Sequence, residues 1–486
     1  MKVFVKNIGI VGIANVIAYF NGFLLFIVIT KMLGATDFGV WRQLLALLRL
    51  LTPIAFLGLA IALIRFLSGE KDINTAQETF YSITFTIMGV SIIIAFVLFV
   101  SSNFIAISFM KDIAISSLIR LVALFFPLYM LSEILFIYFQ AVLQMKKYAS
   151  FLIITYGIEI SFAISTIYFG FGLVGLLLAI MCTRVIMLFF MLPIILREVG
   201  FKWPNFSMSA TFLSFGFPLL PLSFSNWFID SGDRYLIGYF FNPKYVGIYS
   251  ASYVLGSLIS FFATPISTVF YPTMSGLWNT NRKDEFNKYI FYTMKYLLLC
   301  IIPFAVILTL LSKPLLFIFS TEEFYSGNSI VGFIVFGLII YSVSLLPIHI
   351  LTVLKKTKFA LFSYTLAALT NFIMNIILIP MVGILGAAIA TAIGYLVLLY
   401  LTLSEAIKFV NFKFDIGAIV KSLLASVAMS IIIIIMDPKS LIGIFTVVFA
   451  GLSCYVTLII LMRTVTKNEV LFLKNLFISD RLSSNE

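Results

Sequence analysis

Six ionisable side chains lie inside long apolar stretches of this 486-residue chain, where a charge costs several kcal/mol unless it meets water or a partner. Four are basic and two are acidic, so positive charge prevails. The set is Arg49, Arg120, Glu133, Glu159, Arg184 and Lys295. A guanidinium donates two parallel hydrogen bonds to phosphate or carboxylate oxygens. The pattern predicts a wet cationic cavity that binds an anionic group, with Arg49 and Arg184 as leading candidates.

Other polar residues would extend this cavity. Arg42 lies seven residues before Arg49, so the two share a helix face about two turns apart. Arg65 follows near the end of the same apolar stretch. Asn371 and Asn375 lie one helical turn apart and would add a polar lining. We expect four more basic residues to complete the binding surface beside Arg49 and Arg184. They are Arg42, Arg65, Arg120 and Lys295.

The acidic pair Glu133 and Glu159 suggests coupling of transport to H⁺ or Na⁺, and nothing in the sequence selects the ion. A structural interpretation stands beside the functional one. The arginines would then pair with these glutamates, or extend towards lipid headgroups, as Arg120 near a helix end could. We predict no catalytic residue, no metal site and no cofactor.

The composition requires a membrane. The chain is 62% hydrophobic and 11% charged, with a mean hydropathy of +1.14. A bilayer-spanning helix needs about 20 apolar residues, and the stretches are too long and lack the alternation of barrel strands. We therefore expect an all-α polytopic membrane protein with about fourteen transmembrane helices. The predicted spans are 8–30, 40–66, 80–101, 115–142, 149–169, 172–195, 209–229, 246–271, 288–311, 328–353, 359–379, 382–405, 416–436 and 441–462.

Loop charge gives the orientation. The net charge is +12, and most basic loop residues fall on the side that holds both termini, as Lys146, Arg197 and Lys355 do. By the positive-inside rule, both termini lie in the cytoplasm of a multi-pass protein of the cytoplasmic (inner) membrane. Topology thus explains the basic excess, and no nucleic acid partner is expected.

The chain contains an internal repeat. The motif around Gly39 recurs around Gly247, and the Gly172 motif recurs around Gly383. Parallel repeats of six spans clasp a central site about an axis along the membrane normal. The predicted domains are an N-lobe at 1–200, a C-lobe at 201–408, two further spans at 409–465 and a cytoplasmic tail at 466–486. The paired prolines Pro218 and Pro221 predict a bent gate hinge in the seventh span, with a static kink as the alternative.

Several motifs resemble a known family. They are Gly216-Phe217-Pro218, Trp227, Asp233-Arg234-Tyr235-Leu236-Ile237-Gly238 and Val246-Gly247-Ile248-Tyr249-Ser250-Ala251, together with the early Leu33 to Gly39 and Gly58 to Arg65 stretches. Their order and spacing resemble the polysaccharide transporters and O-antigen (Wzx-type) flippases of the multidrug/oligosaccharidyl-lipid/polysaccharide (MOP) superfamily, over nearly the whole chain.

This resemblance implies a V-shaped, pseudo-twofold pair of six-helix lobes working by alternating access. The implied cargo is a polyprenyl (undecaprenyl) diphosphate-linked oligosaccharide, moved to the outer leaflet for O-antigen, capsule or surface polysaccharide synthesis. The resemblance also implies that cavity arginines hold the diphosphate or acidic sugars, which fits Arg49 and Arg184 by type of position. A polysaccharide polymerase and a chain-length regulator would be partners. A lipid II flippase is the main alternative, and a multidrug or cation antiporter is disfavoured because a cationic cavity repels cations.

A membrane glycan polymerase is the enzyme alternative. Such an enzyme would show a long outer loop or a catalytic histidine, whereas the outer loops here are short and the one histidine, His349, lies towards the other side. Asp230 and Asp233 resemble an acidic metal-binding pair only superficially, and we interpret them as a capped helix end. No Gly-rich phosphate loop with Lys occurs. We therefore expect a transporter and not an enzyme.

Overall fold

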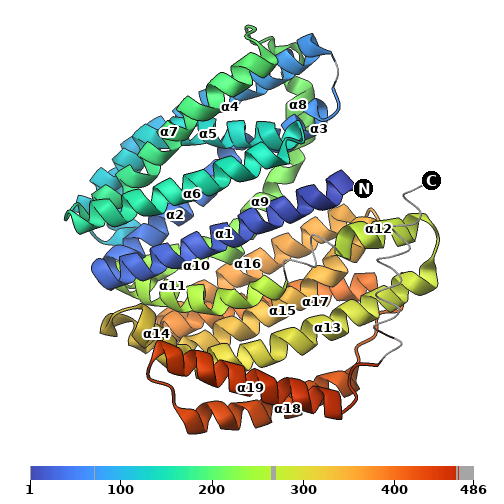
Figure 1. Ribbon diagram of the computed structural model, residues 1–486. Coiled ribbons are helices and arrows are strands. Elements are labelled where there is room, and N and C mark those ends of the chain that lie inside the picture. Colours follow the sequence, from blue (N-terminus) through green and yellow to red (C-terminus); the bar gives the residue numbers. More distant parts are fainter. Residues whose placement is uncertain (1, 71, 264–269, 467–468, 470–486) are drawn as a thin grey trace. The chain divides into compact units, whose positions relative to one another are not determined.

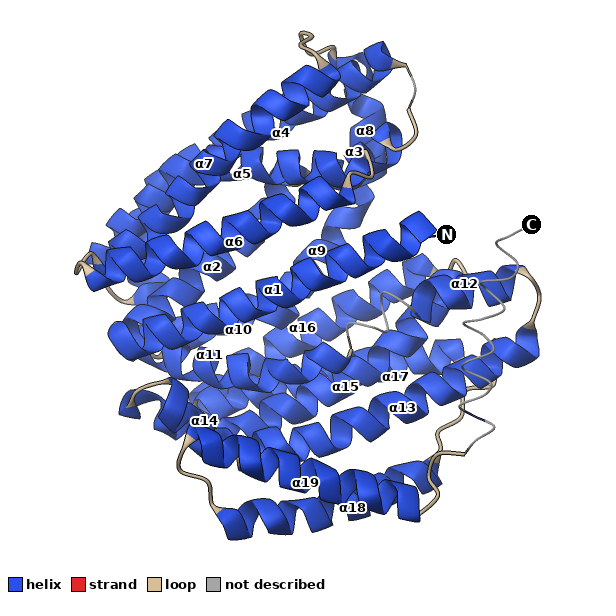
Figure 2. Ribbon diagram, viewed as in Figure 1, coloured by secondary structure: helices blue, strands red, loops and turns tan. Residues whose placement is uncertain are grey.

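The computed structural model describes residues 2–70, 72–263, 270–466 and 469, with the side chains of 2–11, 13–15 and 219 left out. The described residues form helices joined by short connections and contain no strand (Figure 2). The predicted cytoplasmic tail, 466–486, lies almost entirely outside the described residues. The all-α fold class is confirmed.

Twelve helices in the described chain are long and apolar enough to cross a membrane, and a bent pair in the seventh predicted span would make thirteen. The first predicted span falls on a further helix, α1 (Lys2–Met32), whose described apolar part is Val16–Met32. The chain is therefore a multi-pass membrane protein.

The helices gather into two compact units, Lys2–Gly247 and the chain from Ile248 onward. In the first unit α4 packs on α5, α6 packs on both α1 and α7, and α5 also contacts α7 (Figure 1). Its elements are α1, α2 (Gly34–Phe56), α3 (Leu59–Leu67), α4 (Ile73–Met110), η1 (Ile113–Ile115), α5 (Ser116–Ala141), α6 (Met145–Tyr168), α7 (Gly172–Val199), η2 (Phe206–Met208), α8 (Ser209–Gly216), η3 (Phe217–Leu219), α9 (Leu220–Trp227), η4 (Phe228–Gly232) and α10 (Asp233–Phe240).

The second unit centres on α15, α16 and α17, with α13 joining them to the final helix pair. Its elements are most of α11 (Pro243–Ser257), then η5 (Leu258–Phe262), α12 (Tyr271–Asn279), α13 (Lys283–Leu310), α14 (Ser312–Phe319), η7 (Glu322–Gly327), α15 (Asn328–Val353), α16 (Thr357–Val382), α17 (Ile384–Ala406), α18 (Ile416–Met436) and α19 (Leu441–Leu461). The division into lobes at 1–200 and 201–408 stays a prediction.

Side-chain caps fix where the last two helices begin. The Asp415 carboxylate accepts a hydrogen bond from the Ala418 N–H at 2.9 Å, and the Ser440 hydroxyl oxygen accepts one from the Gly443 N–H at 3.1 Å. These contacts satisfy N–H groups that a helix leaves unpaired at its start. Apolar length and a cap together place these two spans within a residue of the prediction.

The predicted span 40–66 is instead broken in two. Leu57 and Gly58 take the left-handed conformation, with φ of 49° and 75°, which ends α2 and starts α3. A Cβ on Gly58 would lie 2.1 Å from the carbonyl oxygen of Gly216 in α8. Only glycine at position 58 allows both this φ and this close backbone approach.

A second close approach joins the starts of α2 and α11. A Cβ on Gly39 would lie 1.7 Å from the Pro243 carbonyl oxygen, and one on Gly247 would lie 1.9 Å from the Ala35 carbonyl oxygen. The contact is reciprocal, since each glycine of the repeat motif meets the residue four positions before the other glycine. The two motifs therefore pack backbone to backbone.

The seventh predicted span is bent by 51° between Phe206–Gly216 and Leu220–Phe240. The bend lies at η3, which contains Pro218. A proline has no N–H to donate and its ring disturbs the preceding turn, so it is a usual cause of such a kink. The bend lies at the predicted proline pair, and its action as a gate stays a prediction.

Candidate functional site

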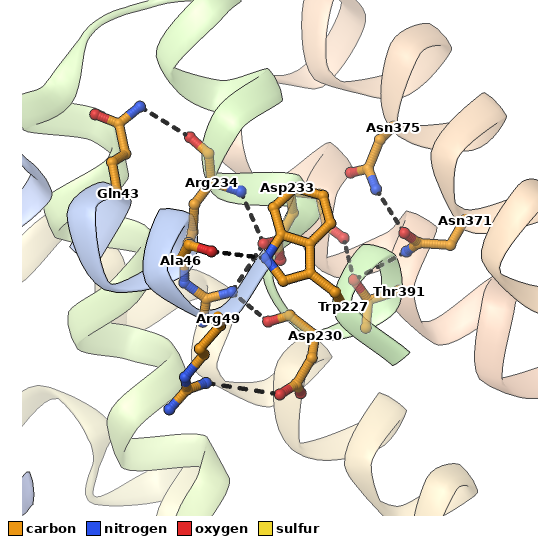
Figure 3. A network of polar contacts seen from close by, with 11 residues as sticks. Gln43, Ala46, Arg49, Trp227, Asp230, Asp233, Arg234, Asn371, Asn375 and Thr391 are labelled. Atoms are coloured by element: carbon orange, nitrogen blue, oxygen red, sulfur yellow. Dashed lines mark hydrogen bonds and ion pairs between the residues drawn. The ribbon is translucent and has the colours of Figure 1, made fainter. Parts of the chain in front are cut away.

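One face of α2 contacts the second half of the bent seventh span. Gln43, Ala46 and Arg49 are spaced by three residues, which places them along one side of the helix. The Trp227 indole Nε1 donates a hydrogen bond to the Ala46 carbonyl oxygen at 2.8 Å (Figure 3). The Tyr235 hydroxyl donates to the Gln43 carbonyl oxygen at 3.0 Å. These two bonds fix the register of α2 against α9 and α10.

Two further hydrogen bonds start from the Gln43 side chain. The Gln43 side-chain amide donates to the carbonyl oxygen of Arg234 at 3.3 Å and to that of Phe109 at 2.9 Å. A Cβ on Gly238 would lie 2.1 Å from the same amide nitrogen, so α10 can approach Gln43 only because a glycine is there. The arrangement ties three elements together beside Arg49.

Between α9 and α10 the chain forms the wide π-helical turn η4, with Asp230 inside it. The buried Arg234 guanidinium donates to the Asp230 carbonyl oxygen and, at 2.9 Å, to the Asp233 carboxylate. Asp233 and Arg234 are 0% and 2% exposed. Our interpretation of the two aspartates as a capped helix end is wrong, because Gly232 and Asp233 keep helical backbone angles and the helix continues.

Asp230 faces Arg49 across this contact (Figure 3). The Arg49 Nη1 and Asp230 Oδ2 atoms are 3.8 Å apart, and the two side chains are 59% and 55% exposed. Where water reaches an exposed ion pair it screens the attraction, and the pair then contributes only about 0.2–1 kcal/mol. Arg49 lies well inside the apolar span Gly34–Phe56. Its guanidinium is therefore exposed although it belongs to the inner part of a candidate membrane helix.

A second charged cluster lies among α5, α6 and α7. Arg184 Nη1 donates to Glu133 Oε1 at 2.8 Å, and its guanidinium carbon lies 5.0 Å from the centre of the Tyr129 ring. Arg184 and Glu133 side chains are 14% and 27% exposed. Glu159 is 8% exposed and feels the charges of Arg184 and Glu133. Within the described chain no hydrogen bond reaches the Glu159 carboxyl.

Two family models each match more than half of the chain. One is described as polysaccharide biosynthesis protein and matches residues 28–329. The chain belongs to this polysaccharide biosynthesis protein family. The other model is described as lipid II flippase MurJ and matches residues 207–462. Both agree with the MOP superfamily, and that prediction is confirmed.

The curated relatives of this family member match over part of their length. A protein of Haloferax volcanii named "Probable low-salt glycan biosynthesis flippase Agl15" is 23% identical over 272 residues, which are 55% of this chain and 58% of that protein. "Lipid II flippase MurJ" of Bacillus subtilis is 29% identical over 137 residues, which are 28% of this chain and 25% of that protein. The chain thus spans just over half of the first relative and a quarter of the second.

Two groups of solved structures share the fold of this family member. A lipid II flippase MurJ in an inward closed conformation superposes with a TM-score of 0.78 at 18% identity, over 93% of this chain and 98% of that one. An inward-facing multidrug resistance MATE family transporter of the MOP superfamily gives 0.63 at 14% identity, over 79% and 93%. At these identities the likeness establishes the fold.

Two other predicted cations of this family member, Arg120 and Arg65, contact side chains of α4 and α8. Arg120 donates to the Ser102 hydroxyl at 3.0 Å and to the Asn103 amide oxygen at 2.9 Å, both on α4. Arg65, at the end of α3, lies over the Phe215 ring with 4.4 Å between the guanidinium carbon and the ring centre. Arg42 is half-buried on α2.

Lys295 belongs to an ion cluster of the second unit. Its Nζ lies 3.0 Å from the Asp415 carboxylate and 3.0 Å from the Glu469 carboxylate, and its side chain is 4% exposed. Tyr296 donates a further hydrogen bond to Glu469 at 3.1 Å. The cluster joins α13 to the start of α18 and to the chain after α19.

Asn371 and Asn375 are buried between α16 and α17. The Asn375 amide donates to the Asn371 oxygen at 3.1 Å, and the Asn371 amide donates to the Thr391 hydroxyl at 3.3 Å (Figure 3). Gly394 allows this packing, because a Cβ there would lie 2.9 Å from the Asn371 Cβ. The pair forms an interhelical chain of hydrogen bonds inside the second unit.

Sequence reasoning missed Asp230 as the partner of Arg49. The two residues are 181 positions apart, and a lone aspartate near a span end resembles an ordinary cap. One signal was available, because Arg42, Gln43 and Arg49 are polar side chains within the apolar span of α2. Polar side chains inside a membrane helix require a polar partner or water, so a partner from another helix was to be expected.

Proposed function

We propose that this chain is a flippase that carries a polyprenyl-diphosphate-linked oligosaccharide from the cytoplasmic to the outer leaflet by alternating access. Family membership supports a role in polysaccharide biosynthesis, and the name of the relative Agl15, a probable glycan biosynthesis flippase, supports a glycan as the cargo of a flippase. The product would serve the synthesis of a surface polysaccharide.

The exposed guanidinium of Arg49 carries the proposal. It is 59% exposed within an apolar span, and a charge there is tolerated when it faces water or a bound partner. Its fork can bind two oxygens of a diphosphate. Arg42, on the same helix face, would add positive charge along the route.

We place the other cations outside the diphosphate site. Lys295 already contacts two carboxylates, and Arg120 and Arg65 contact α4 and α8 side chains. Arg184 stands beside two glutamates, so its cluster carries a net negative charge when both are ionised. Such a cluster does not attract an anion.

The test is transport by purified protein in proteoliposomes with a lipid-linked oligosaccharide. We expect Arg49→Ala to lose most transport and Arg49→Lys to keep part of it, because Lys retains the charge without the fork. Arg120→Ala is the matched control, since it removes an exposed arginine elsewhere in the first unit. Equal transport by Arg49→Ala and Arg120→Ala would refute the proposal.

We also propose that Glu159 couples transport to protons. A buried carboxyl without a hydrogen-bond partner is less costly to bury with a proton bound, and the nearby Arg184 already pairs with Glu133. Glu159→Gln should abolish the response of transport to an imposed pH gradient. Glu78→Gln, which removes an outlying carboxylate paired with Lys202, should leave the response intact, and an unchanged response in Glu159→Gln would exclude this role.

Lipid II is the second candidate cargo, favoured by the model match over residues 207–462. Both cargoes carry a diphosphate, so the site does not distinguish them. A competition experiment would, because the true cargo inhibits transport of a labelled lipid-linked oligosaccharide at lower concentration. Inhibition by lipid II at the lower concentration would reverse our choice.

The setting of the protein is also proposed. We place it in the cytoplasmic membrane with both termini in the cytoplasm, acting as a transporter without enzymatic activity. A polysaccharide polymerase and a chain-length regulator would act on the cargo after it crosses. Reporter fusions at the two ends would test the orientation, and an external location of either end would overturn it.

A further inference from the structure

We propose that Asp230 is a resident counterion for Arg49, which the diphosphate of the cargo displaces on binding and which returns when the cargo leaves. The inference rests on the proposed function. It assigns Asp230 a role in selecting and releasing the cargo, beyond the binding role given to Arg49.

The geometry holds the two side chains in register without locking them together. Hydrogen bonds from Trp227 to Ala46 and from Tyr235 to Gln43 fix the backbone of the seventh span against α2 on the face that bears Arg49. The Arg49 and Asp230 side chains themselves extend beyond these bonds, and 3.8 Å separates their nearest charged atoms. The scaffold is rigid while the ion pair is loose.

The π-helical turn places Asp230 opposite Arg49. Arg234, in α10 just after the turn, binds the Asp233 carboxylate at 2.9 Å. It reaches Asp230 through the backbone carbonyl oxygen. The Asp233 carboxylate thus neutralises the buried arginine, and the Asp230 carboxylate is directed at Arg49.

The exposure of the pair makes it exchangeable. Both side chains are more than half exposed. In the water-filled passage that the proposed function requires, water would screen their attraction, and ion pairs of this kind are weak. A diphosphate carries more charge than one carboxylate and can accept two bonds from the guanidinium fork. It should therefore displace Asp230, whereas a monovalent anion, with no advantage over the resident carboxylate, should not.

The same competition assists release. When the diphosphate leaves, the Asp230 carboxylate pairs with Arg49 again. Rebinding of the cargo then has to compete with this ion pair. Removal of the carboxylate should therefore tighten binding and slow transport at once. This opposite change in two measurements separates a displaced counterion from a residue that only supports the fold.

The experiment measures inorganic pyrophosphate binding to the full chain in nanodiscs by calorimetry, alongside transport of the lipid-linked oligosaccharide. Asp230→Asn should bind pyrophosphate roughly two- to fivefold more tightly than the unmodified protein, the ratio that a weak ion pair implies. Transport should slow, and added chloride should now weaken pyrophosphate binding more than it does in the unmodified protein. Asp230→Ala repeats the measurement if Asp230→Asn does not fold.

Asp112→Asn is the matched control, because Asp112 caps η1 at 2.9 Å from the Ala114 N–H and asparagine caps equally well. It should change neither measurement. If Arg49→Ala abolishes pyrophosphate binding while both Asp230 variants bind equally or more weakly than the unmodified protein, the counterion role is refuted and the proposed function stands. If Arg49→Ala leaves both binding and transport unchanged, the proposed function fails and the counterion role fails with it.

Discussion

A single methyl group at Gly39 should separate the starts of α2 and α11. In Gly39→Ala the added Cβ would lie 1.7 Å from the Pro243 carbonyl oxygen and 2.9 Å from the Gly247 N. Ordinary contacts of a Cβ begin at 3.4 Å, so the two backbones must move apart by about 1.7 Å along that line. No flexible side chain can absorb the change.

The cost follows from the nature of the obstacle. Overpacking a well-packed contact typically costs about 1–3 kcal/mol, and a backbone carbonyl places this site at the upper end. About 3 kcal/mol corresponds to a shift on the order of a hundredfold in the equilibrium between the packed and separated arrangements. Gly247→Ala should act in the same way, because its Cβ would lie 1.9 Å from the Ala35 carbonyl oxygen.

The assay uses a buried reporter next to the contact. Val246 is 0% exposed, so a Val246→Cys thiol should resist a water-soluble maleimide in a background where Cys182, Cys300 and Cys454 are serine. Gly39→Ala should raise the labelling rate and lower the thermal unfolding midpoint. Gly89→Ala is the control, since nothing lies within 4 Å of a Cβ there. Equal labelling and equal midpoints in the two alanine variants would refute the packing argument.

Three further predictions concern the second unit. Lys295→Met should lower the free energy of unfolding by about 3–5 kcal/mol, because Asp415 and Glu469 would lose a buried cation; chemical unfolding in detergent measures this, and a change below 1 kcal/mol would contradict it. Burial alone would raise the pKa of Asp415, but hydrogen bonds from a backbone N–H and from Lys295 hold it below its usual value. The stabilising contribution of the Asp415 carboxylate is therefore complete above about pH 4 and is lost as the pH falls below that. Acid should then expose α18 to hydrogen exchange before α15, and simultaneous exchange of the two helices would contradict this prediction. Tyr455→Phe should cost about 1–3 kcal/mol by leaving the Leu299 carbonyl oxygen without this 2.8 Å hydrogen bond; an unchanged unfolding midpoint would show that the bond contributes nothing.

The sequence predicts span positions well where length and capping decide them. Spans predicted at 416–436 and 441–462 correspond to Ile416–Met436 and Leu441–Leu461, because apolar length and a local cap determine both ends. The prediction from sequence fails at 40–66. The helix breaks at Gly58 because the chain there contacts the backbone of Gly216, 158 residues later. That contact has no local signature.

The same distinction applies to the candidate site. Hydropathy alone identifies Arg49 and Arg184 as unusual. The alternative that Arg184 pairs with Glu133 could be stated in advance, because both charges lie inside predicted spans of the same half of the chain. The π-helical turn could not, since Trp227, the residue before it, is held by a hydrogen bond to the Ala46 carbonyl oxygen 181 positions away. Charge in an apolar stretch is visible in a sequence, whereas the identity of its partner is a property of the fold.

The last helix pair offers a practical handle on this protein. Met429, Ile433 and Tyr455 of α18 and α19 form one apolar cluster with Leu299 and Ile307 of α13. This apolar cluster packs α18 and α19 against α13. We therefore expect the two helices to move together with α13 during transport. A spectroscopic probe on an exposed position of α18 would then report the movement of the second unit. Such a probe would be far in the sequence from every residue to which a role in cargo binding is proposed.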